Sequence, residues 1–540
     1  MTRALLFLVS GSLFVTFAQN PCDKLKATSF PDSTITAVEA VAAGPAPNVG
    51  RGGGGAAAGA PAQGRGGTPP AGDPQAAPGG RGGAAAPQAA AGGRGAAPAA
   101  PVMLPAYCRV AVTMKPSTDS SIDMEVWMPA ENWNNKFQMV GNGGWAGTLS
   151  LAAMQAALRE GYATATTDTG HKGGASVFAL NHPEKLVDFA YRAVHETVVK
   201  SKTLITVYYG KAPKFSYWNG CSTGGRQGLM EAQKFPDDFD AIVAGAPADY
   251  QTHLHAWDMM VATGIRKDDQ HFVSAPKLAA LNKAVMAACD AADGVKDGLL
   301  NDPRKCKFDP ATLSCKNGDD KDDCLTPAQL ESVKLVLSPA KKKNGELIFP
   351  GKEPGSETTW TMLSQRNPNP ADLPMGTFQY ATYQDANWDW HTFDLDRDTT
   401  AADEKFGYVN ATSDLNAFKN RGGKLLMYHG WSDTAISPEN SINLYTNIVQ
   451  KTGSKSDNWI KLYMIPGMGH CQGGGTDQFN KMGVIERWRE ANTAPEAIMA
   501  AHVTGSNVEM TRPLCPYPQV AVYKGVGSTN DAANFSCKAP

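Results

Sequence analysis

The feature of this sequence that most constrains its fold is an alternation of short apolar runs with segments of helical spacing. The runs occupy residues 137–140, 162–167, 215–218 and 241–244, and the helical segments occupy residues 151–160, 186–209 and 225–234. Strands that alternate with helices in this way predict an α/β fold, with a mostly parallel sheet covered on both faces. Two earlier runs, 110–114 and 122–128, alternate apolar with polar residues and predict a pair of half-buried strands.

The alternation stops near residue 249 and resumes after residue 403. The intervening stretch is rich in Asp, Lys, Pro and Cys, and it holds four cysteines close together. We therefore expect residues 249–403 to form an inserted lid domain over the sheet. Buried-type strands return at 424–429 and 459–465. Residues 102–248 and 404–540 are accordingly expected to be the two parts of one core.

The first residues are typical of an export signal. Arg3 supplies a positive start, residues 4–17 form an apolar run, and Ala18 suits a cleavage site. An uncleaved membrane anchor is the alternative, but the run is shorter than the roughly 20 residues of a membrane span. The sequence predicts a signal peptide over residues 1–18, a short N-terminal segment over 19–42, and a secreted or periplasmic protein that leaves the membrane after cleavage.

Residues 43–101 consist almost entirely of Ala, Gly, Pro, Gln and Arg. Such a tract has too little apolar surface to offset the entropy of ordering, so a disordered spacer is expected. Its RGG triplets raise RNA binding as an alternative. Export and a net charge of −2 argue against a nucleic-acid partner, because no excess of positive charge is available to hold one.

The chain holds ten cysteines, an even number that suits a complete set of disulfides in an oxidising compartment. No Cys/His spacing typical of zinc is present. The pairing does not follow from sequence alone, although short loops make Cys289–Cys306, Cys315–Cys324 and Cys515–Cys537 natural candidates. If Cys22 pairs with Cys108, the 43–101 tract is a long loop outside the fold, and loop length costs little.

The strongest chemical signal is the GxSxG sequence of residues 220–224, which places Ser222 between a predicted strand and a predicted helix. A tight strand-to-helix turn pushes a serine clear of the sheet, and the flanking glycines remove side chains that would clash. The motif alone is a common accident, but this context predicts an α/β-hydrolase fold with Ser222 as its nucleophile.

Such a nucleophile needs a base and an acid that orients the base, in the chain order Ser, Asp, His. Asp433 follows the strand 424–429, and His470 lies in a Gly-rich loop after the strand 459–465. Both positions lie past strand ends, where open α/β sheets place their active sites. A helix-capping role for Asp433 and an ordinary loop histidine are the alternatives. The order and positions together predict Asp433 and His470 as the catalytic partners of Ser222.

Two cysteines adjoin these residues, because Cys221 precedes Ser222 and Cys471 follows His470. A disulfide between them would clamp the nucleophile and the base next to each other, and small misplacements of such groups are costly to rate. The rival reading makes Cys221 a thiol nucleophile. Export and the even number of cysteines favour the disulfide.

The oxyanion formed during attack needs two hydrogen-bond donors. One is expected to be the backbone N–H of Thr223, which follows the nucleophile, and the other comes from a loop after an earlier strand. Gly143 or Gly144 fits this role, because glycine lets the backbone approach a substrate closely. A plain Gly-rich turn is the alternative.

A second site is predicted in the lid, where Asp290, Asp293 and Asp297 recur within one short stretch together with Gly294 and Gly298. Three carboxylates at this spacing suit a structural calcium ion, although the stretch lacks the length and closing Glu of an EF-hand loop. Acidic turns that contain glycine are also common without any ion.

Three stretches of the chain make it recognisable: 217–228 (YWNGCSTGGRQG), 235–240 (FPDDFD) and 244–248 (AGAPA). Together they resemble the tannase and feruloyl esterase family, as do the C-terminal stretches 512–518 and 534–537. The likeness runs from about Cys22 to the end, with the 43–101 tract as a departure. The family's Cys-Ser, Asp and His-Cys arrangement matches Cys221-Ser222, Asp433 and His470-Cys471.

This resemblance implies hydrolysis of esters of aromatic acids such as ferulic or gallic acid, including substrates linked to plant polymers, through an acyl-enzyme. It also implies a calcium loop, with the side chains of Asp290, Asp293 and Asp297 and the carbonyls of Val295 and Leu299 as ligands, and no organic cofactor. The family includes a hydrolase of mono(2-hydroxyethyl) terephthalate, which is an alternative activity. A catalytically silent exported binding protein on the same scaffold is another.

Overall fold

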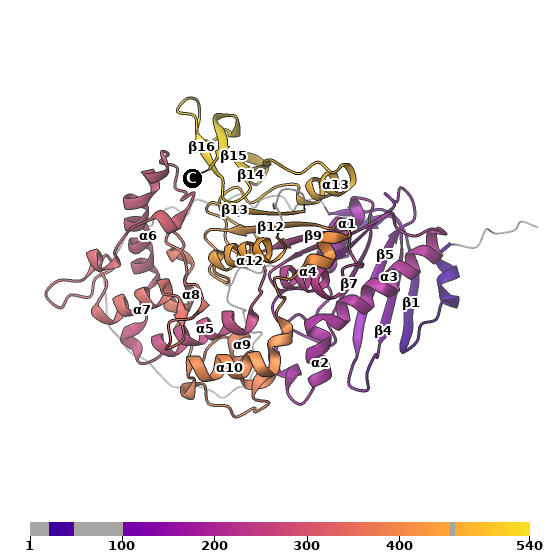
Figure 1. Ribbon diagram of the computed structural model, residues 1–540, viewed down its shortest axis with the longest axis horizontal. Coiled ribbons are helices and arrows are strands. Elements are labelled where there is room, and N and C mark those ends of the chain that lie inside the picture. Colours follow the sequence, from indigo (N-terminus) through magenta and orange to yellow (C-terminus); the bar gives the residue numbers. More distant parts are fainter. Residues whose placement is uncertain (1–20, 48–100, 454–458, 540) are drawn as a thin grey trace, which may run out of the picture.

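The computed structural model describes residues 21–47, 101–453 and 459–539. The predicted signal peptide, most of the predicted 43–101 tract and Pro540 lie outside the described residues. Within the described part, a sheet of nine strands forms the centre of the molecule, in the order β1-β4-β5-β7-β6-β8-β9-β12-β13 (Figure 1). Its strands are β1 (Ser33–Val41), β4 (Tyr107–Met114), β5 (Ile122–Pro129), β6 (Lys136–Val140), β7 (Ala163–Thr167), β8 (Phe215–Cys221), β9 (Ala241–Gly245), β12 (Lys424–Gly430) and β13 (Ile460–Ile465).

The sheet is mostly parallel, as the alternation of strands and helices predicts. Strands β7, β6, β8, β9, β12 and β13 pair in parallel, whereas β1, β4 and β5 form an antiparallel edge that joins β7. The predicted strands 110–114 and 122–128 are the neighbours β4 and β5. The sequence analysis did not foresee β1, which pairs with β4 at the edge.

Helices cover both faces of the sheet, and each face has its own apolar core. On one face pack α3 (Ala193–Tyr209), α4 (Thr223–Lys234) and α12 (Pro438–Lys451). On the other pack α1 (Leu151–Arg159) and α13 (Lys481–Ala491). Along β12, Leu425 and Met427 belong to the first core, and Leu426 and Tyr428 belong to the second. A strand buried on both faces needs such a continuous apolar run.

Several predicted boundaries differ from the structure by a few residues, and two of them lie near the functional turn and its covering helix. Strand β8 extends to Cys221, beyond the predicted residue 218, because its last residues still pair with β9. The predicted helix 186–209 begins earlier, as α2 (Pro183–Val187), and continues through a π-helical turn at Asp188–Arg192 into α3. Proline at the first helical position explains the earlier start, since proline lacks an N–H that the helix would not use there.

Residues between β9 and β12 build a separate helical body beside the sheet, with an apolar core of its own (Figure 1). It contains a small hairpin, β10 (Ala340–Lys341) with β11 (Leu347–Phe349). Its helices are α5 (Gln251–Ile265), α6 (Ala275–Cys289), α7 (Pro327–Leu337), α8 (Thr361–Ser364), α9 (Asp372–Gly376) and α10 (Leu395–Phe406). This body is called the lid segment below, and its predicted bounds of 249–403 stay a prediction.

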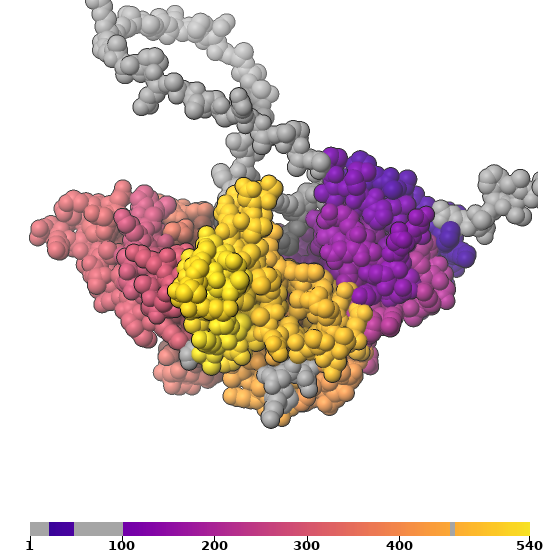
Figure 2. Space-filling model, turned by 90° about the horizontal axis from the view of Figure 1, so that it is seen from above, coloured from indigo at the N-terminus to yellow at the C-terminus, as the bar shows by residue number. Residues whose placement is uncertain are grey.

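The C-terminal part adds two hairpins, β14 (Ile498–Thr504) with β15 (Asn507–Leu514) and β16 (Val520–Tyr523) with β17 (Phe535–Lys538). Seen from above, this yellow region lies between the lid segment and the N-terminal part of the core (Figure 2). A short helix, α11 (Asn416–Asn420), precedes β12. In the described residues, no helix has both the length and the apolar character of a membrane span.

All ten cysteines form disulfides, and every pairing that the sequence suggested is present. Three bridges close short loops: Cys289–Cys306, Cys315–Cys324 and Cys515–Cys537. Cys22–Cys108 ties the N-terminal 3₁₀ turn (Pro21–Ala27) to β4. Cys221–Cys471 joins residues that are 250 positions apart in the sequence. Five disulfides fit an oxidising compartment.

Candidate active site

Ser222 occupies the turn between β8 and α4, where the backbone is strained. Its φ of 61° and ψ of −127° lie in a region that residues with side chains rarely adopt, and such strain persists where the surrounding structure enforces it. The flanking glycines permit the turn, since a Cβ on Gly220 would lie 2.4 Å from the carbonyl oxygen of Gly224. The GxSxG spacing thus reflects a close contact between the strand end and the first turn of the helix.

Asp433 lies just past β12 with its side chain buried. Its Oδ1 accepts hydrogen bonds from the backbone N–H groups of Ala435 (2.8 Å) and Ile436 (2.9 Å). Its Oδ2 lies 2.7 Å from Nδ1 of His470. Burial alone would raise the pKa of Asp433, but the charge of His470 and the hydrogen bonds from two histidines hold it well below its usual range. The carboxylate therefore stays ionised at any physiological pH.

His470 reaches Asp433 from the loop after β13 and remains partly exposed. Because an ionised carboxylate only accepts hydrogen bonds, His470 donates its Nδ1–H to Asp433 and keeps Nε2 for another partner. Gly430, at the end of β12, lets this loop approach, since a Cβ there would lie 2.1 Å from the carbonyl oxygen of Met468. The hydrogen bond to Asp433 thus fixes the orientation of the His470 ring and leaves its Nε2 free to accept a proton.

The disulfide between Cys221 and Cys471 brings the two loops together. Their Cα atoms are 6.0 Å apart, so the residues that adjoin them, Ser222 and His470, stand on neighbouring backbone segments. The rival interpretation of Cys221 as a thiol nucleophile is therefore excluded in this oxidised form, because its sulfur is already bonded. Cys471 itself has a φ of 66°, which turns the chain sharply after His470.

His429 is the residue of this site that sequence reasoning missed. It is fully buried at the end of β12, and its Nε2 lies 3.0 Å from the same Oδ2 of Asp433 that His470 contacts. Its Nδ1 lies 2.7 Å from the hydroxyl oxygen of Ser441. Asp433 thus receives hydrogen bonds from two histidines and two backbone groups. The signal in the sequence was a histidine ending an otherwise apolar strand, four residues before the predicted acid.

The loop with Gly143 and Gly144 is fastened directly to the start of α4. The N–H of Gly224 donates to the carbonyl of Asn142 (2.8 Å), and the hydroxyl of Thr223 donates to the carbonyl of Gly144 (2.7 Å). Among the described residues, no hydrogen bond uses the backbone N–H of Gly143, Gly144 or Thr223. Those groups lie at the N-terminus of α4, which favours negative charge. They are thus available to an oxyanion.

Asp290, Asp293 and Asp297 lie in one loop of the lid segment, but their carboxylate oxygens do not all come within 4.8 Å of one another, and they already have partners. Asp290 accepts backbone N–H bonds from Asp297 (3.2 Å) and Gly298 (3.0 Å), and Asp297 pairs with Arg512 at 2.6 Å. Burial raises the pKa values of Asp293 and Asp297, and the mutual repulsion of the carboxylates adds to this.

The backbone of the same loop also offers oxygen atoms. Among the described residues, the carbonyl oxygens of Val295 and Leu299 accept no hydrogen bond. The three carboxylates outnumber the two basic groups Lys296 and Arg512, and oxygen donors of this kind suit a hard cation such as calcium, although the carboxylates would have to draw closer to hold one.

Comparisons with known proteins agree with one another. A family model described as tannase and feruloyl esterase matches residues 108–538. An uncharacterized esterase of Xanthomonas campestris is 36% identical over 494 residues, which cover 80% of this chain and 84% of the relative. A probable feruloyl esterase B-2 of Aspergillus terreus is 36% identical over 454 residues, 80% of this chain and 86% of the relative. The solved structure of feruloyl esterase B from Aspergillus oryzae superposes with a TM-score of 0.80 at 29% identity, covering 96% of this chain and all of that one (100%).

Proposed function

The chain belongs to the tannase and feruloyl esterase family and is a carboxylic ester hydrolase, and we propose that it is a secreted enzyme that cleaves esters of aromatic acids through Ser222. The observation that carries this proposal is the contact of His470 Nδ1 with Asp433 Oδ2 at 2.7 Å, on a loop that a disulfide ties to the residue before Ser222. A nucleophile, an oriented base and a buried acid are the parts that acyl transfer requires.

In the proposed reaction, the hydroxyl of Ser222 attacks the ester carbonyl while Nε2 of His470 takes its proton. Asp433 holds the Nδ1–H tautomer of His470 and stabilises the imidazolium that forms. His470 then passes the proton to the leaving alcohol, which departs and leaves the aromatic acid bonded to Ser222. A water molecule repeats the steps with His470 as base, and the free acid is released.

The tetrahedral intermediate carries its negative charge on the former carbonyl oxygen. We assign the donors for this oxygen to the N–H of Thr223 and the N–H of Gly143 or Gly144. The hydrogen bonds from Gly224 to Asn142 and from Thr223 to Gly144 hold the two donor segments in register before substrate arrives. Donors fixed in advance stabilise the transition state without reorganisation, which is usually the largest contribution to such catalysis.

The acid component of the substrate is proposed from the relatives. Proteins of similar length and 34–36% identity are named as probable feruloyl esterases, which supports a hydroxycinnamate ester. A gallate ester and mono(2-hydroxyethyl) terephthalate are the competing substrates within the family. Five disulfides support export, because such bridges persist in oxidising compartments.

The proposal includes a structural calcium ion in the acidic loop. Asp290, Asp293 and Asp297, with the carbonyls of Val295 and Leu299, would hold it, and its role would be to cross-link the loop. Binding requires Asp290 to exchange at least one backbone hydrogen bond for the ion. No step of ester hydrolysis depends on it.

Release of ferulate and gallate from their methyl esters tests the function. Wild-type protein and Ser222→Ala are compared, with mono(2-hydroxyethyl) terephthalate as a third substrate. We expect the wild type to hydrolyse methyl ferulate fastest and the variant to lose at least 10³-fold of that rate. Faster release of gallate or terephthalate would change the proposed substrate, but the proposed mechanism through Ser222 would stand. A folded wild type that cleaves none of the three would contradict the proposal.

A further inference from the structure

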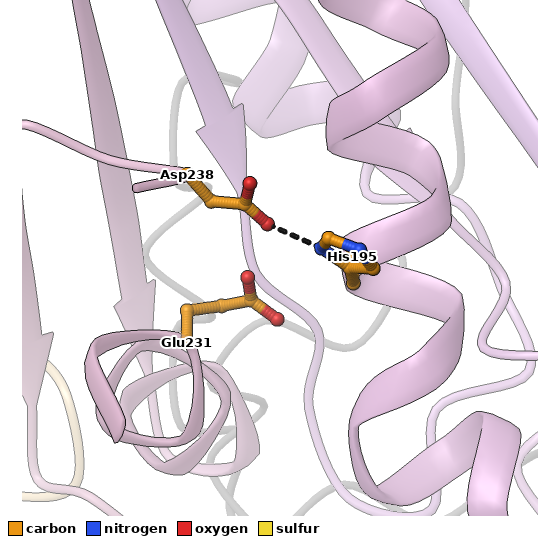
Figure 3. A group of neighbouring side chains, drawn as sticks. All are labelled: His195, Glu231 and Asp238. Carbon is orange, nitrogen blue, oxygen red and sulfur yellow. Dashed lines mark hydrogen bonds and ion pairs between the residues drawn. The ribbon is translucent and has the colours of Figure 1, made fainter. Parts of the chain in front are cut away.

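A second cluster of ionisable side chains lies near the C-terminal end of α4, whereas the turn that holds Ser222 lies at the N-terminal end of that helix. It consists of His195 on α3, Glu231 near the end of α4 and Asp238 in the turn that leads to β9. Among the described residues, this is the only group of three or more His, Cys, Asp or Glu side chains whose ligand atoms all lie within 4.8 Å of one another. Figure 3 shows the carboxylate of Glu231 turned toward the other two.

Glu231 has no partner for its charge. Its side chain is 1% exposed, and neither of its carboxylate oxygens receives a hydrogen bond from an N–H or hydroxyl donor among the described residues; the side chain within hydrogen-bond reach is the carboxylate of Asp238. An ionised carboxylate buried without donors is very costly, so such a group must be protonated or bound to a cation. Burial and the neighbouring charge of Asp238 raise the pKa of Glu231 well above its usual value.

The neighbouring cations are already committed elsewhere. Nδ1 of His195 lies 2.6 Å from Oδ2 of Asp238, and the imidazole stacks on the ring of Phe235 at 3.7 Å. Lys202 donates to the backbone carbonyl of Asp238 at 2.6 Å and not to a carboxylate. The cluster therefore holds two carboxylates and one imidazole, with Glu231 uncompensated.

We propose that His195, Glu231 and Asp238 form a structural site for a divalent transition-metal ion, with zinc as the cation that suits it best. Imidazole nitrogen and carboxylate oxygen are both zinc ligands, at about 2.0–2.2 Å. Tetrahedral ligands at that distance lie roughly 3.3 Å apart. The three ligand atoms are within reach of that spacing once His195 and Asp238 separate enough to admit the ion.

An ion could enter this site from solvent, and once bound it would connect two helices. The side chain of His195 is 29% exposed, so the imidazole forms the outer wall of the cluster. The three ligands come from α3, α4 and the turn before β9, and α4 is the helix that begins directly after Ser222. A bound ion would therefore join the outer end of α4 to α3. Water would complete the coordination on the exposed side.

Zinc binding by the intact protein tests this site. The protein is freed of transition metals and kept in excess calcium, so that the acidic loop of the lid segment stays saturated, and zinc chloride is then titrated calorimetrically. We expect one zinc ion per chain at micromolar affinity or better, and a melting temperature that rises by a few degrees when zinc is added.

Isosteric variants locate the ion. Glu231→Gln and Asp238→Asn should abolish both the calorimetric signal and the thermal shift, whereas Asp293→Asn, in the other acidic loop, should keep them. His195→Gln is a second test at a partly exposed position, where folding is less at risk, and it should weaken binding at least tenfold.

A folded wild type that binds no zinc overturns the proposal, and so does a Glu231→Gln variant that binds zinc as tightly as the wild type. In the first case Glu231 is a protonated acid that shares its proton with Asp238. Glu231→Gln would then be as stable as the wild type, because an amide can replace a protonated carboxyl group.

Discussion

At the scale of single residues, Asp433 is the best-connected group of the site, and the second histidine on it has a measurable role. His429 and His470 both contact Oδ2 of Asp433, at 3.0 Å and 2.7 Å. Only His470 is partly exposed and able to meet a substrate. We therefore expect His429 to act as a positioning residue through Asp433.

We expect His429→Gln to lower kcat by about tenfold with little change in KM, because the carboxylate loses a fixed donor but keeps its charge. Asp433→Asn is the matched comparison and should cost about 10⁴-fold, since it removes the charge and disturbs the tautomer of His470. Steady-state kinetics on one aryl ester measures both. An equal loss in the two variants would mean that His429 does more than hold Asp433.

Glu353 gives a test of pH dependence. Burial, with the nearby charge of Glu439, raises its pKa to about 8. Its folded pKa lies above the unfolded value, so the folded state holds a proton that the unfolded state releases. This group therefore costs stability progressively as pH rises from about 4.5 toward 8.

Glu353→Gln should consequently stabilise the protein at pH 8 by an amount on the order of 4 kcal/mol, and at pH 5 by less than about 1 kcal/mol. Chemical denaturation at the two pH values measures the difference. Glu346→Gln is the control, because Glu346 is exposed and its bond with Lys342 lowers its pKa. A gain at pH 5 that equals the gain at pH 8 would show that ionisation is not the cause.

At the scale of structural elements, the bridge from Cys221 to Cys471 connects the last residue of β8 with the loop after β13. These strands are not adjacent in the sheet, since β9 and β12 separate them. The disulfide therefore fixes a distance that strand pairing alone leaves free.

Removing this bridge with Cys221→Ala and Cys471→Ala together should lower kcat by roughly 10²-fold, because Ser222 and His470 lose their common anchor. The pair Cys315→Ala and Cys324→Ala removes a bridge that lies in the lid segment and should leave kcat nearly unchanged. Kinetics at a temperature where both variants are folded separates the effects. Unchanged kcat without the active-site bridge would refute its positioning role.

The acidic loop of the lid segment contacts the C-terminal part through the ion pair of Asp297 with Arg512. If the loop binds calcium, removing calcium should lower the melting temperature by several degrees, and calcium alone should restore it. Differential scanning calorimetry measures both steps. Asp293→Asn should abolish the dependence on calcium, and Asp319→Asn, at an exposed acid of the same segment, should not. If the melting temperature of the wild type does not change when calcium is removed, the proposed calcium site is wrong.

At the scale of the whole molecule, the sequence predicted the parts that follow from periodicity. Apolar runs identified the parallel strands, and the glycines around Ser222 identified the turn, because sterics there leave few alternatives. The β1 edge and the C-terminal hairpins were missed, since the sequences of β1 and β14 mix isolated apolar residues with small and polar ones and form no apolar run. His429 was missed because only the fold shows that its ring faces Asp433. The cluster of His195, Glu231 and Asp238 comes from segments whose spacing has no recognisable pattern.

The entrance and exit of the 48–100 segment lie beside each other. Strand β2 (Gly44–Pro45) pairs with β3 (Met103–Leu104), and the N–H of Ala46 donates to the carbonyl of Val102 at 2.6 Å. The described chain therefore stops and resumes at neighbouring positions, so a short connection could join the two ends. Replacing residues 48–100 by a two-residue turn should leave the melting temperature and kcat within error.

The same arrangement predicts that a chain cut between residues 47 and 101 stays together. Trypsin cleavage at Arg65 or Arg81 would separate residues 21–47 from the rest of the backbone, but Cys22 would still be bonded to Cys108 and β1 would still pair with β4. A cleaved sample should therefore run as one species on a non-reducing gel and release a small fragment only after reduction. Its activity, measured after cleavage and before reduction, should be unchanged. If the cleaved protein behaves in this way, the Cys22–Cys108 disulfide is a second covalent tie at the N-terminal edge that can stand in for the peptide chain.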